Sequence, residues 1–335
     1  MLPTKKKIFR ILRWFGFCVF AILITVLPFK LLTEHSEPEF GFTFSNYYAQ
    51  YLGLDVPEVY EAVLTDMDFK HVRIPVYWTE IESSPREYDF SQIDYLINSA
   101  GARGVGVTLA IGVKVPRWPE CFVPDWADDL ETQASQDLFY EMMETVVNRY
   151  KDNPALERWQ VENEPFFPFG ECLTPDPERY AREIALVREL DPNHVISSTT
   201  SGEQSLWFLR AKGLDVLGVS MYREVWNKQI GAMVFPHSPS LYALQRLLAS
   251  PFLKNVIISE LQMEPWIPED IQTSDTPIEE FYSMFPVADM IDNLEFAKKI
   301  GVSEIDVWGV EWWYYLKERG EPRLWETAIE LFNTK

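Results

Sequence analysis

Histidine and cysteine are scarce in this chain, which has four histidines and three cysteines among 335 residues. The histidines (His35, His71, His194 and His237) are scattered and show no metal-ligand spacing, so no zinc site is expected. The sequence also lacks a P-loop and a G-x-S-x-G elbow. The glycines of residues 101–106 precede a predicted strand instead of following one, which indicates a helix-to-strand turn. We therefore expect neither a cofactor nor a metal.

Basic residues are also few outside the amino terminus. Lys plus Arg is 30 and Asp plus Glu is 51, for a net charge of −21. Residues 1–30 hold six of the basic residues and no acidic one, so the rest of the chain carries about −27. A body this acidic repels phosphate backbones, which excludes nucleic acid as an expected partner. Neutral and cationic ligands remain open.

Long apolar runs are missing except for one, Phe15–Phe29, which follows a basic segment. Fifteen residues is short for a spanning helix, where about 20 is usual, and is typical of a signal-peptide core. Flanking apolar and basic residues can extend it to a spanning length, and no small-x-small cleavage site follows. We expect residues 1–35 to form a cytoplasmic basic end and an uncleaved signal anchor in the membrane, with a cleaved signal as the alternative. Residues 36–335 would then lie outside the cytoplasm.

The three cysteines fit this arrangement. Cys18 lies in the apolar run, whereas Cys121 and Cys172 fall in loops after predicted strands. Outside the cytoplasm a disulfide between these two can persist. The sequence does not show their separation, so a bridge and two free thiols are both open.

From residue 40 onward, short apolar, β-branched runs alternate with helical patterns, and no repeat or low-complexity stretch marks a second domain. The predicted strands are Phe40–Ser45, Val72–Trp78, Val105–Gly112, Arg158–Glu164, Val195–Ser201, Val216–Tyr222, Val256–Leu261 and Ile305–Trp313. The predicted helices are 57–67, 91–103, 132–150, 177–190, 205–212, 240–249, 286–300 and 324–332. Eight strand–helix pairs predict an α/β fold of the (β/α)8 TIM-barrel type for 36–335, with a doubly wound sheet as the alternative. In a barrel, the loops after the strands build the active-site face.

Two glutamates end predicted strands four and seven. Glu164 stands in an Asn-Glu-Pro segment after the fourth strand, and Glu260 ends the apolar run of the seventh, with Glu264 as a nearby rival. Strand alternation would send Glu162 and Glu164 to the same side. Each glutamate alone could be a solvated strand end. Together, across a barrel mouth and about 5–5.5 Å apart, they could perform retaining glycoside hydrolysis.

These segments resemble clan A glycoside hydrolases, the retaining (β/α)8 enzymes that include the cellulases and mannanases of family 5. The resemblance implies that Glu164 is the acid/base, that Glu260 is the nucleophile, and that Asn163 hydrogen-bonds the sugar 2-hydroxyl. The acid requires a raised pKa for Glu164, from burial and the negative neighbour. Glu260 must stay ionised.

Further positions match the clan less closely. Arg73 in HVRIPVYW resembles the arginine that orients the nucleophile, and Tyr222 resembles its strand-six aromatic hydroxyl. The strand-eight tryptophan platform falls on Trp312 or Trp313, which the sequence does not separate. Residues 220–222 read Ser-Met-Tyr where family 5 often has His-x-Tyr. Other tryptophans at or beyond predicted strand ends fit a sugar-binding cleft: Trp78, Trp118, Trp126, Trp226 and Trp266.

The sequence therefore predicts a membrane-anchored, monomeric glycoside hydrolase that acts on a β-linked oligo- or polysaccharide by double displacement. Two other functions stay open. One is a non-catalytic glycan-binding protein on a hydrolase-like barrel, although binding alone would not require both carboxylates. The other is a transglycosylase, which passes the glycosyl-enzyme to another sugar instead of water.

Overall fold

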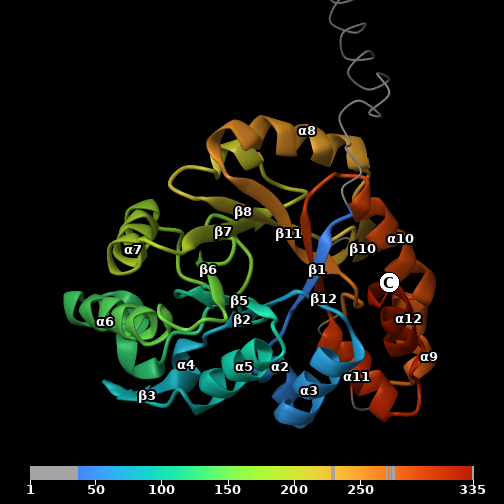
Figure 1. Cartoon of the computed structure of the whole chain (residues 1–335), viewed down its shortest axis with the longest axis horizontal. Coiled ribbons are helices and arrows are strands. Elements are labelled where there is room, and N and C mark those ends of the chain that lie inside the picture. The colour runs from blue at the N-terminus through green and yellow to red at the C-terminus, as the bar shows by residue number, and fades with distance from the viewer. Residues whose placement is uncertain (1–36, 228–230, 269–270, 272, 274–275, 334–335) are drawn as a thin grey trace, which may run out of the picture.

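Eight parallel strands close into a barrel (Figure 1). The computed structural model describes residues 37–333 except 228–230, 269–270, 272 and 274–275. The barrel strands are β1 (Glu39–Thr43), β2 (His71–Pro75), β5 (Gly106–Ile111), β6 (Leu156–Val161), β7 (Val195–Ser201), β8 (Val216–Met221), β11 (Asn255–Gln262) and β12 (Glu304–Trp308). They lie side by side in chain order, and β1 pairs with both β2 and β12 to close the ring. The predicted (β/α)8 barrel is confirmed.

The helices form a ring around the strands (Figure 1). Those that connect or follow barrel strands are α3 (Val56–Asp66), α5 (Ser91–Ala102), α6 (Gln133–Tyr150), α7 (Pro177–Leu190), α8 (Pro239–Ala249), α10 (Val287–Lys298) and α12 (Arg323–Phe332). Asp55 and Asp176 cap α3 and α7 by accepting backbone N–H bonds from the first turn, as those residue types favour. The strands between are buried on both faces, as in the uninterrupted GVTLAI of β5.

Two arginine side chains extend across the barrel interior, where their polar contacts take the place of some of the aliphatic packing usual in such barrels. Arg73 on β2 reaches Gln160 on β6 and Glu260 on β11. Arg158 on β6 reaches Thr108 on β5, at 3.1 Å from its Nε, and pairs with a glutamate on β12. Buried charges of this kind are stable only when paired and hydrogen-bonded. Arginine–glutamate pairs therefore link non-adjacent strands across the barrel interior, β2 with β11 and β6 with β12.

Four sequence predictions about elements are wrong. The helix expected at 205–212 is a single 3-10 turn, Trp207–Leu209, because Trp207 is buried and its indole N–H bonds the Gly202 carbonyl 3.2 Å away. The second and fourth strands end at Pro75 and Val161, each three residues early. The eighth strand ends at Trp308, and helix α11 (Val310–Glu318) follows at once.

Several short elements decorate the loops. They are helices α2 (Asn46–Tyr51), α4 (Trp78–Ile81) and α9 (Ile278–Met284), and strands β3 (Glu82–Ser84), β4 (Glu87–Tyr88), β9 (Glu224–Asn227) and β10 (Gly231–Val234). β3 pairs with β4, and β9 with β10, as small antiparallel ribbons outside the barrel. None had been predicted, because runs this short carry little periodicity.

The predicted anchor, residues 1–35, lies outside the described residues. Among the helices that the structure describes from residue 37 onward, none is long and apolar enough to cross a bilayer.

Cys121 and Cys172 form a disulfide, with their Cα atoms 5.1 Å apart. It links the loop after β5 to the loop after β6, next to the ends of the strands that carry the candidate site. Of the two alternatives that the sequence left open, the bridge is the one present.

Opening this bridge is expected to lower the free energy of unfolding by about 2–4 kcal/mol, because a link between residues 51 apart restricts the unfolded chain. Urea denaturation of the Cys121→Ala/Cys172→Ala variant measures the loss, and Cys18→Ala is the matched control that leaves the bridge intact. Thiol titration of the denatured, unreduced chain should find one free thiol. Three free thiols would show that the bridge does not form in solution.

Candidate active site

The two glutamates that the sequence singled out lie at the same mouth of the barrel. Glu164 follows the end of β6, and Glu260 lies near the carboxyl end of β11, where the register of this strand shifts against β8. Such a bulge re-aims side chains at the rim of a barrel. Both carboxyls are buried, at 7% and 4% exposure, and the Glu260 charge raises the pKa of Glu164. The structure thus brings the predicted pair into one site.

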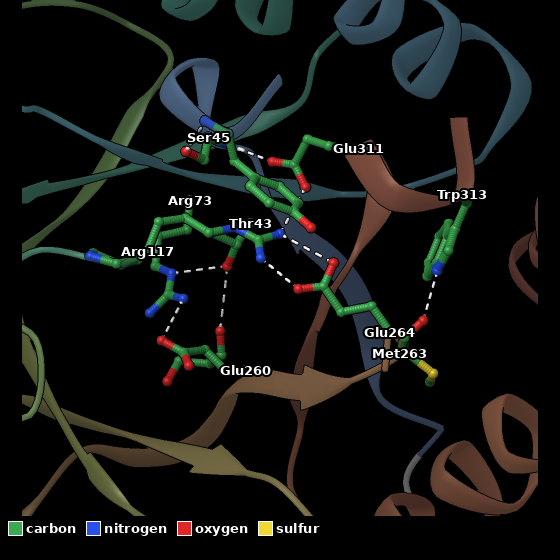
Figure 2. A network of polar contacts seen from close by, with 12 residues as sticks. Thr43, Ser45, Arg73, Arg117, Glu260, Met263, Glu264, Glu311 and Trp313 are labelled. Carbon is green, nitrogen blue, oxygen red and sulfur yellow. Dashed lines mark hydrogen bonds and ion pairs between the residues drawn. The ribbon is translucent and has the colours of Figure 1, made fainter. Parts of the chain in front are cut away.

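Glu260 receives a donor on each carboxylate oxygen. Arg73 Nη2 lies 2.8 Å from Oε1, and the Tyr222 hydroxyl donates to Oε2 at 2.9 Å. Figure 2 shows Arg73 hydrogen-bonded both to Thr43 and to Glu260. A guanidinium and a phenol thus each donate to one oxygen of the same carboxylate and fix its orientation. The predicted partners of Glu260 are therefore both in place.

Arg73 is itself fixed on three sides. Its Nε donates to Thr43 Oγ1 at 2.9 Å and its Nη1 to Gln160 Oε1 at 3.2 Å, and the side chain is 1% exposed. With its donors divided among strands β1, β6 and β11, the guanidinium has little freedom to move. It holds the Glu260 carboxylate in one orientation.

Glu164 is held by its backbone and perturbed by its surroundings. Its φ is 46°, a left-handed value that is uncommon for a residue with a side chain, and its N–H donates to Thr199 Oγ1 at 2.8 Å. Burial, followed by the Glu260 charge, raises the pKa of Glu164 to about 8, against an opposing effect of Lys114. A carboxyl that keeps its proton at neutral pH can act as a general acid.

The expectation that Glu162 and Glu164 share one side of a strand is wrong, because the strand has already ended. Glu162 also has a positive φ, of 59°, so alternation does not apply. Its carboxylate accepts backbone N–H bonds from Val113 at 3.0 Å and Lys114 at 2.7 Å. Glu162 therefore fastens the loop after β5 to the loop after β6.

Asn163 has its amide orientation set by two donors. Its Oδ1 accepts from the Thr199 hydroxyl at 2.7 Å and from Gln160 Nε2 at 3.2 Å. The NH₂ group consequently faces the other way, and Nδ2 donates to Glu120 Oε2 at 3.1 Å. The predicted sugar-binding amide thus already has a carboxyl neighbour.

The tryptophan at the eighth strand is Trp308, and the prediction of Trp312 or Trp313 is wrong. Both of those residues lie in α11, at most 1% exposed, and the Trp313 indole donates to the Met263 carbonyl at 2.7 Å. Trp308 ends β12, and its ring lies 6.3 Å from that of Tyr222. The prediction extended the strand too far, because Gly309, with φ of 130°, turns the chain into helix α11 directly after Trp308.

Sequence reasoning missed a charged hairpin in the loop after β5, defined here as the Lys114–Cys121 hairpin. Lys114 pairs with Cys121 as an antiparallel bridge, and the Val115 N–H donates to the Glu120 carbonyl at 2.9 Å. Lys114 Nζ donates to the carbonyls of Glu164 and Phe167 at 3.3 and 3.0 Å. The sequence indicated only that VPRWPE, residues 115–120, resembles the strand-three region of clan A enzymes, and it assigned no role to the charged residues.

Arg117 in this hairpin is the centre of a buried ion cluster. It pairs with Glu264, and its Nη2 lies 3.0 Å from Glu311 Oε2 (Figure 2). Its guanidinium lies 3.8 Å from the Tyr48 ring centroid and 4.1 Å from that of Trp308. Glu264, the rival to Glu260 in sequence, is therefore occupied as an ion-pair partner.

Aromatic rings border the site on the side of Tyr222. The Trp266 ring lies 5.5 Å from Tyr222 and 5.5 Å from Phe169, which in turn lies 5.8 Å from Trp118. Trp118 is 52% exposed, so an apolar surface leads from solvent to the half-buried Tyr222. Flat rings of this kind can pack on the C–H faces of a sugar.

One group among the described residues could hold a metal ion: potential ligand atoms of His71, Glu304 and Asp306 lie within 4.8 Å of one another. They meet over Gly41, where a Cβ would lie 2.2 Å from Asp306 Oδ1. These residues lie at or near the beginnings of β2 and β12, at the end of the barrel opposite the carboxylate pair. Arg158 already pairs with Glu304. The group takes no part in the chemistry at the mouth.

Comparison with known families identifies the relationship. A family model described as Cellulase (glycosyl hydrolase family 5) matches residues 36–248, more than half of the chain. The matched range contains Asn163 and Glu164 and ends before β11 and Glu260. The Ser-Met-Tyr sequence at 220–222 lies inside the match, so this departure from the His-x-Tyr pattern does not remove the chain from the family.

Two curated relatives share parts of this sequence. The putative mannan endo-1,4-beta-mannosidase 4 of Arabidopsis thaliana is 31% identical over 153 residues, 36% of this chain and 36% of that protein. The probable mannan endo-1,4-beta-mannosidase F of Aspergillus flavus is 34% identical over 121 residues, which are 33% of this chain and 25% of that protein. The similarity therefore spans well under half of each relative.

Solved structures show the same fold. A thermostable mutant of a Cellvibrio japonicus xylanase superposes with a TM-score of 0.57, over 91% of this chain and 100% of that one, at 15% identity. At this identity the likeness concerns the barrel alone.

Proposed function

The chain belongs to the cellulase family, glycosyl hydrolase family 5, and is a glycoside hydrolase; we propose that it cleaves β-linked sugars with retention of anomeric configuration. One observation carries the proposal. Glu260 accepts hydrogen bonds from Arg73 and Tyr222 in the same site as Glu164, a buried carboxyl with a raised pKa. A carboxylate that is paired with an arginine, beside a second carboxyl of raised pKa, supplies one nucleophile and one acid.

In the first step, Glu260 attacks the anomeric carbon as the glycosidic C–O bond breaks. Glu164 gives its proton to the leaving oxygen, so the leaving sugar departs as a neutral alcohol. Arg73 aims the attacking carboxylate, and Asn163 donates to the sugar 2-hydroxyl. The product of this step is a glycosyl ester on Glu260.

In the second step, the ionised Glu164 takes a proton from water, which attacks the same carbon and releases Glu260. Two inversions give net retention. Once the proton has left Glu164, its carboxylate lies beside a neutral ester at Glu260 instead of a second negative charge. This cycling of charge requires no cofactor.

We propose a β-1,4-linked mannan as the first substrate to test, since both curated relatives named above are described as mannan endo-1,4-beta-mannosidases. The aromatic border formed by Trp118, Phe169 and Trp266 supports a polymeric substrate, because it extends sugar-packing surface beyond the reacting carbon.

The test is hydrolysis by the full chain of β-mannan, β-glucan and β-xylan, with proton NMR of the first anomer released. Reducing ends that appear as the β-anomer support retention, and first release of the α-anomer contradicts it. Sugar acceptors added to the same assay reveal transglycosylation as longer products. Binding of these glycans without turnover would favour the non-catalytic alternative.

Activity is expected to fall as the pH rises through about 8, because Glu164 must carry a proton to protonate the leaving group and its pKa is about 8. The alkaline limb of kcat/KM on a substrate with a poor leaving group measures this value. A dinitrophenyl glycoside, which needs no acid to leave, should show a weaker limb. An alkaline limb near 4.5 would contradict the assignment of a raised pKa to the acid.

We also propose that residues 36–335 act outside the cytoplasm, tethered by the segment that precedes them. The Cys121–Cys172 disulfide supports this location, because such bridges persist in oxidising compartments. Digestion by protease added to intact cells, with loss of the full-length chain, would agree with it. Protection until the cells are lysed would contradict it.

A further inference from the structure

Glu120 is a third carboxyl at the catalytic pair, and the mechanism above does not use it. It is 6% exposed, and among the described residues its carboxylate accepts a side-chain hydrogen bond from the Asn163 amide, 3.1 Å away. Burial, together with the Glu260 charge and against the effect of Lys114, raises the pKa of Glu120 to about 7. Burying a carboxyl is costly, so a carboxyl that is retained beside a reacting centre needs an explanation.

The position of this carboxyl is fixed by the fold. The backbone of Glu120 has φ of 76° and that of Arg117 has φ of 92°, both left-handed values that are costly for residues with side chains. Gly170 packs so closely that a Cβ there would lie 2.6 Å from Glu120 Cβ. The next residue in the chain, Cys121, is bridged to Cys172. Such strain persists only where the surroundings define the geometry strongly, as they do here.

The hairpin that carries Glu120 has two charged sides. Arg117 reaches the ion cluster with Glu264 and Glu311, whereas Glu120 reaches Asn163. The arginine anchors the tip of the hairpin to the loop after β11 and to helix α11. The glutamate is thereby presented to the loop after β6, which bears the acid.

Glu120 and Asn163 together can bind one hydroxyl group, since the first accepts a hydrogen bond and the second donates one. Asn163 Nδ2 carries two hydrogens, and its Oδ1 is taken up by Thr199 and Gln160, so the second N–H is the group that it can offer a ligand. A hydroxyl can accept from that N–H and donate its own hydrogen to the Glu120 carboxylate. An ammonium group could donate to Glu120 but could not accept from Asn163.

We propose that Glu120 accepts a hydrogen bond from the 2-hydroxyl of the sugar attacked by Glu260, and so selects sugars that carry a free hydroxyl at this carbon. The inference rests on the proposed function and extends it to substrate selection. As positive charge develops on the anomeric carbon, the adjacent hydroxyl becomes more acidic, and its bond to a carboxylate strengthens. Glu120 therefore binds the transition state more tightly than the substrate.

The test compares two probes on the full chain: 4-nitrophenyl β-mannobioside and the same compound without the 2-hydroxyl on the sugar that carries the nitrophenyl group. The corresponding cellobiosides serve if the polysaccharide assay selects glucan. In Glu120→Ala, kcat/KM on the hydroxylated probe should fall about 10- to 100-fold, as for loss of a hydrogen bond to a charged group. On the deoxy probe it should fall less than about 3-fold.

Glu120→Gln keeps the shape and an acceptor oxygen, so it should lie between wild type and Glu120→Ala on the hydroxylated probe. Glu171→Gln is the matched control: it is an exposed glutamate next to the other half of the disulfide, and neither probe should be affected. Thermal unfolding of each variant separates loss of folding from loss of binding.

Three outcomes overturn the assignment. Equal losses on the two probes would make Glu120 a structural residue of the hairpin. Loss of more than about 10³-fold on both probes, restored by azide, would make Glu120 the acid/base in place of Glu164. If the wild type turns over neither probe and no polysaccharide, the proposed function itself fails, and the selection of a hydroxyl by Glu120 fails with it.

Discussion

Glu260→Ala is expected to lower kcat by at least about 10⁴-fold, because without this carboxylate no glycosyl-enzyme can form. Azide should restore turnover, since the small anion can occupy the space left by the side chain and attack the anomeric carbon in its place. One displacement replaces two, so the product should be the α-glycosyl azide from a β-glycoside. Hydrolysis of an aryl β-glycoside by the full chain, with NMR of the azide product, measures both effects.

Glu164→Ala provides the contrasting result. On a substrate with a good leaving group it should still form the glycosyl-enzyme, and azide should then attack that intermediate to give the β-glycosyl azide. Glu264→Gln is the control for the rival carboxylate and should keep turnover that does not depend on azide. Undiminished turnover in Glu260→Ala, or an α-glycosyl azide from Glu164→Ala, would contradict the assignment of the two roles.

Arg117→Met is expected to lower the free energy of unfolding by about 3–5 kcal/mol. The guanidinium is buried between two rings, and its removal leaves Glu264 and Glu311 buried without their shared cation. Glu311 is 0% exposed, so solvent cannot replace the lost charge. Urea denaturation measures the change, and the triple variant Arg117→Met/Glu264→Gln/Glu311→Gln should recover much of it.

Arg86→Met is the matched control, since it breaks an arginine–glutamate pair whose side chains are 64% and 39% exposed. Exposed pairs of this kind contribute about 1 kcal/mol or less. A loss in Arg117→Met no larger than in Arg86→Met would mean that the cluster does not hold the barrel mouth together.

The barrel could be predicted because its signals are local. Apolar β-branched runs such as VTLAIG, separated by helices with Asp caps at 55 and 176, identify strand–helix pairs within windows of a few residues. Where the local signal was ambiguous, prediction failed. VWGVEWWYY is apolar enough for a strand, and only the sharp turn at Gly309 separates β12 from α11.

The same distinction applies to the site. Glu164 and Glu260 could be placed from sequence because each lies close to the carboxyl end of a recognisable strand, and the resemblance to clan A glycoside hydrolases extended the prediction to Arg73, Tyr222 and Asn163. The contacts of these residues with one another, and the disulfide, agree with a site assembled at the strand ends. Glu120 and Arg117 were assigned no role, since VPRWPE resembles the clan only as a segment and a charged loop residue is normally solvated.

The sequence by itself determined the order of the strands and the positions of the two carboxyls, because both follow from local pattern and chain order. Only the tertiary structure decided which charges meet. The raised pKa of Glu164, the cluster around Arg117 and the contact of Glu120 with Asn163 each join residues from different loops. Electrostatic effects depend on distance and burial in space, which separation along the chain does not specify.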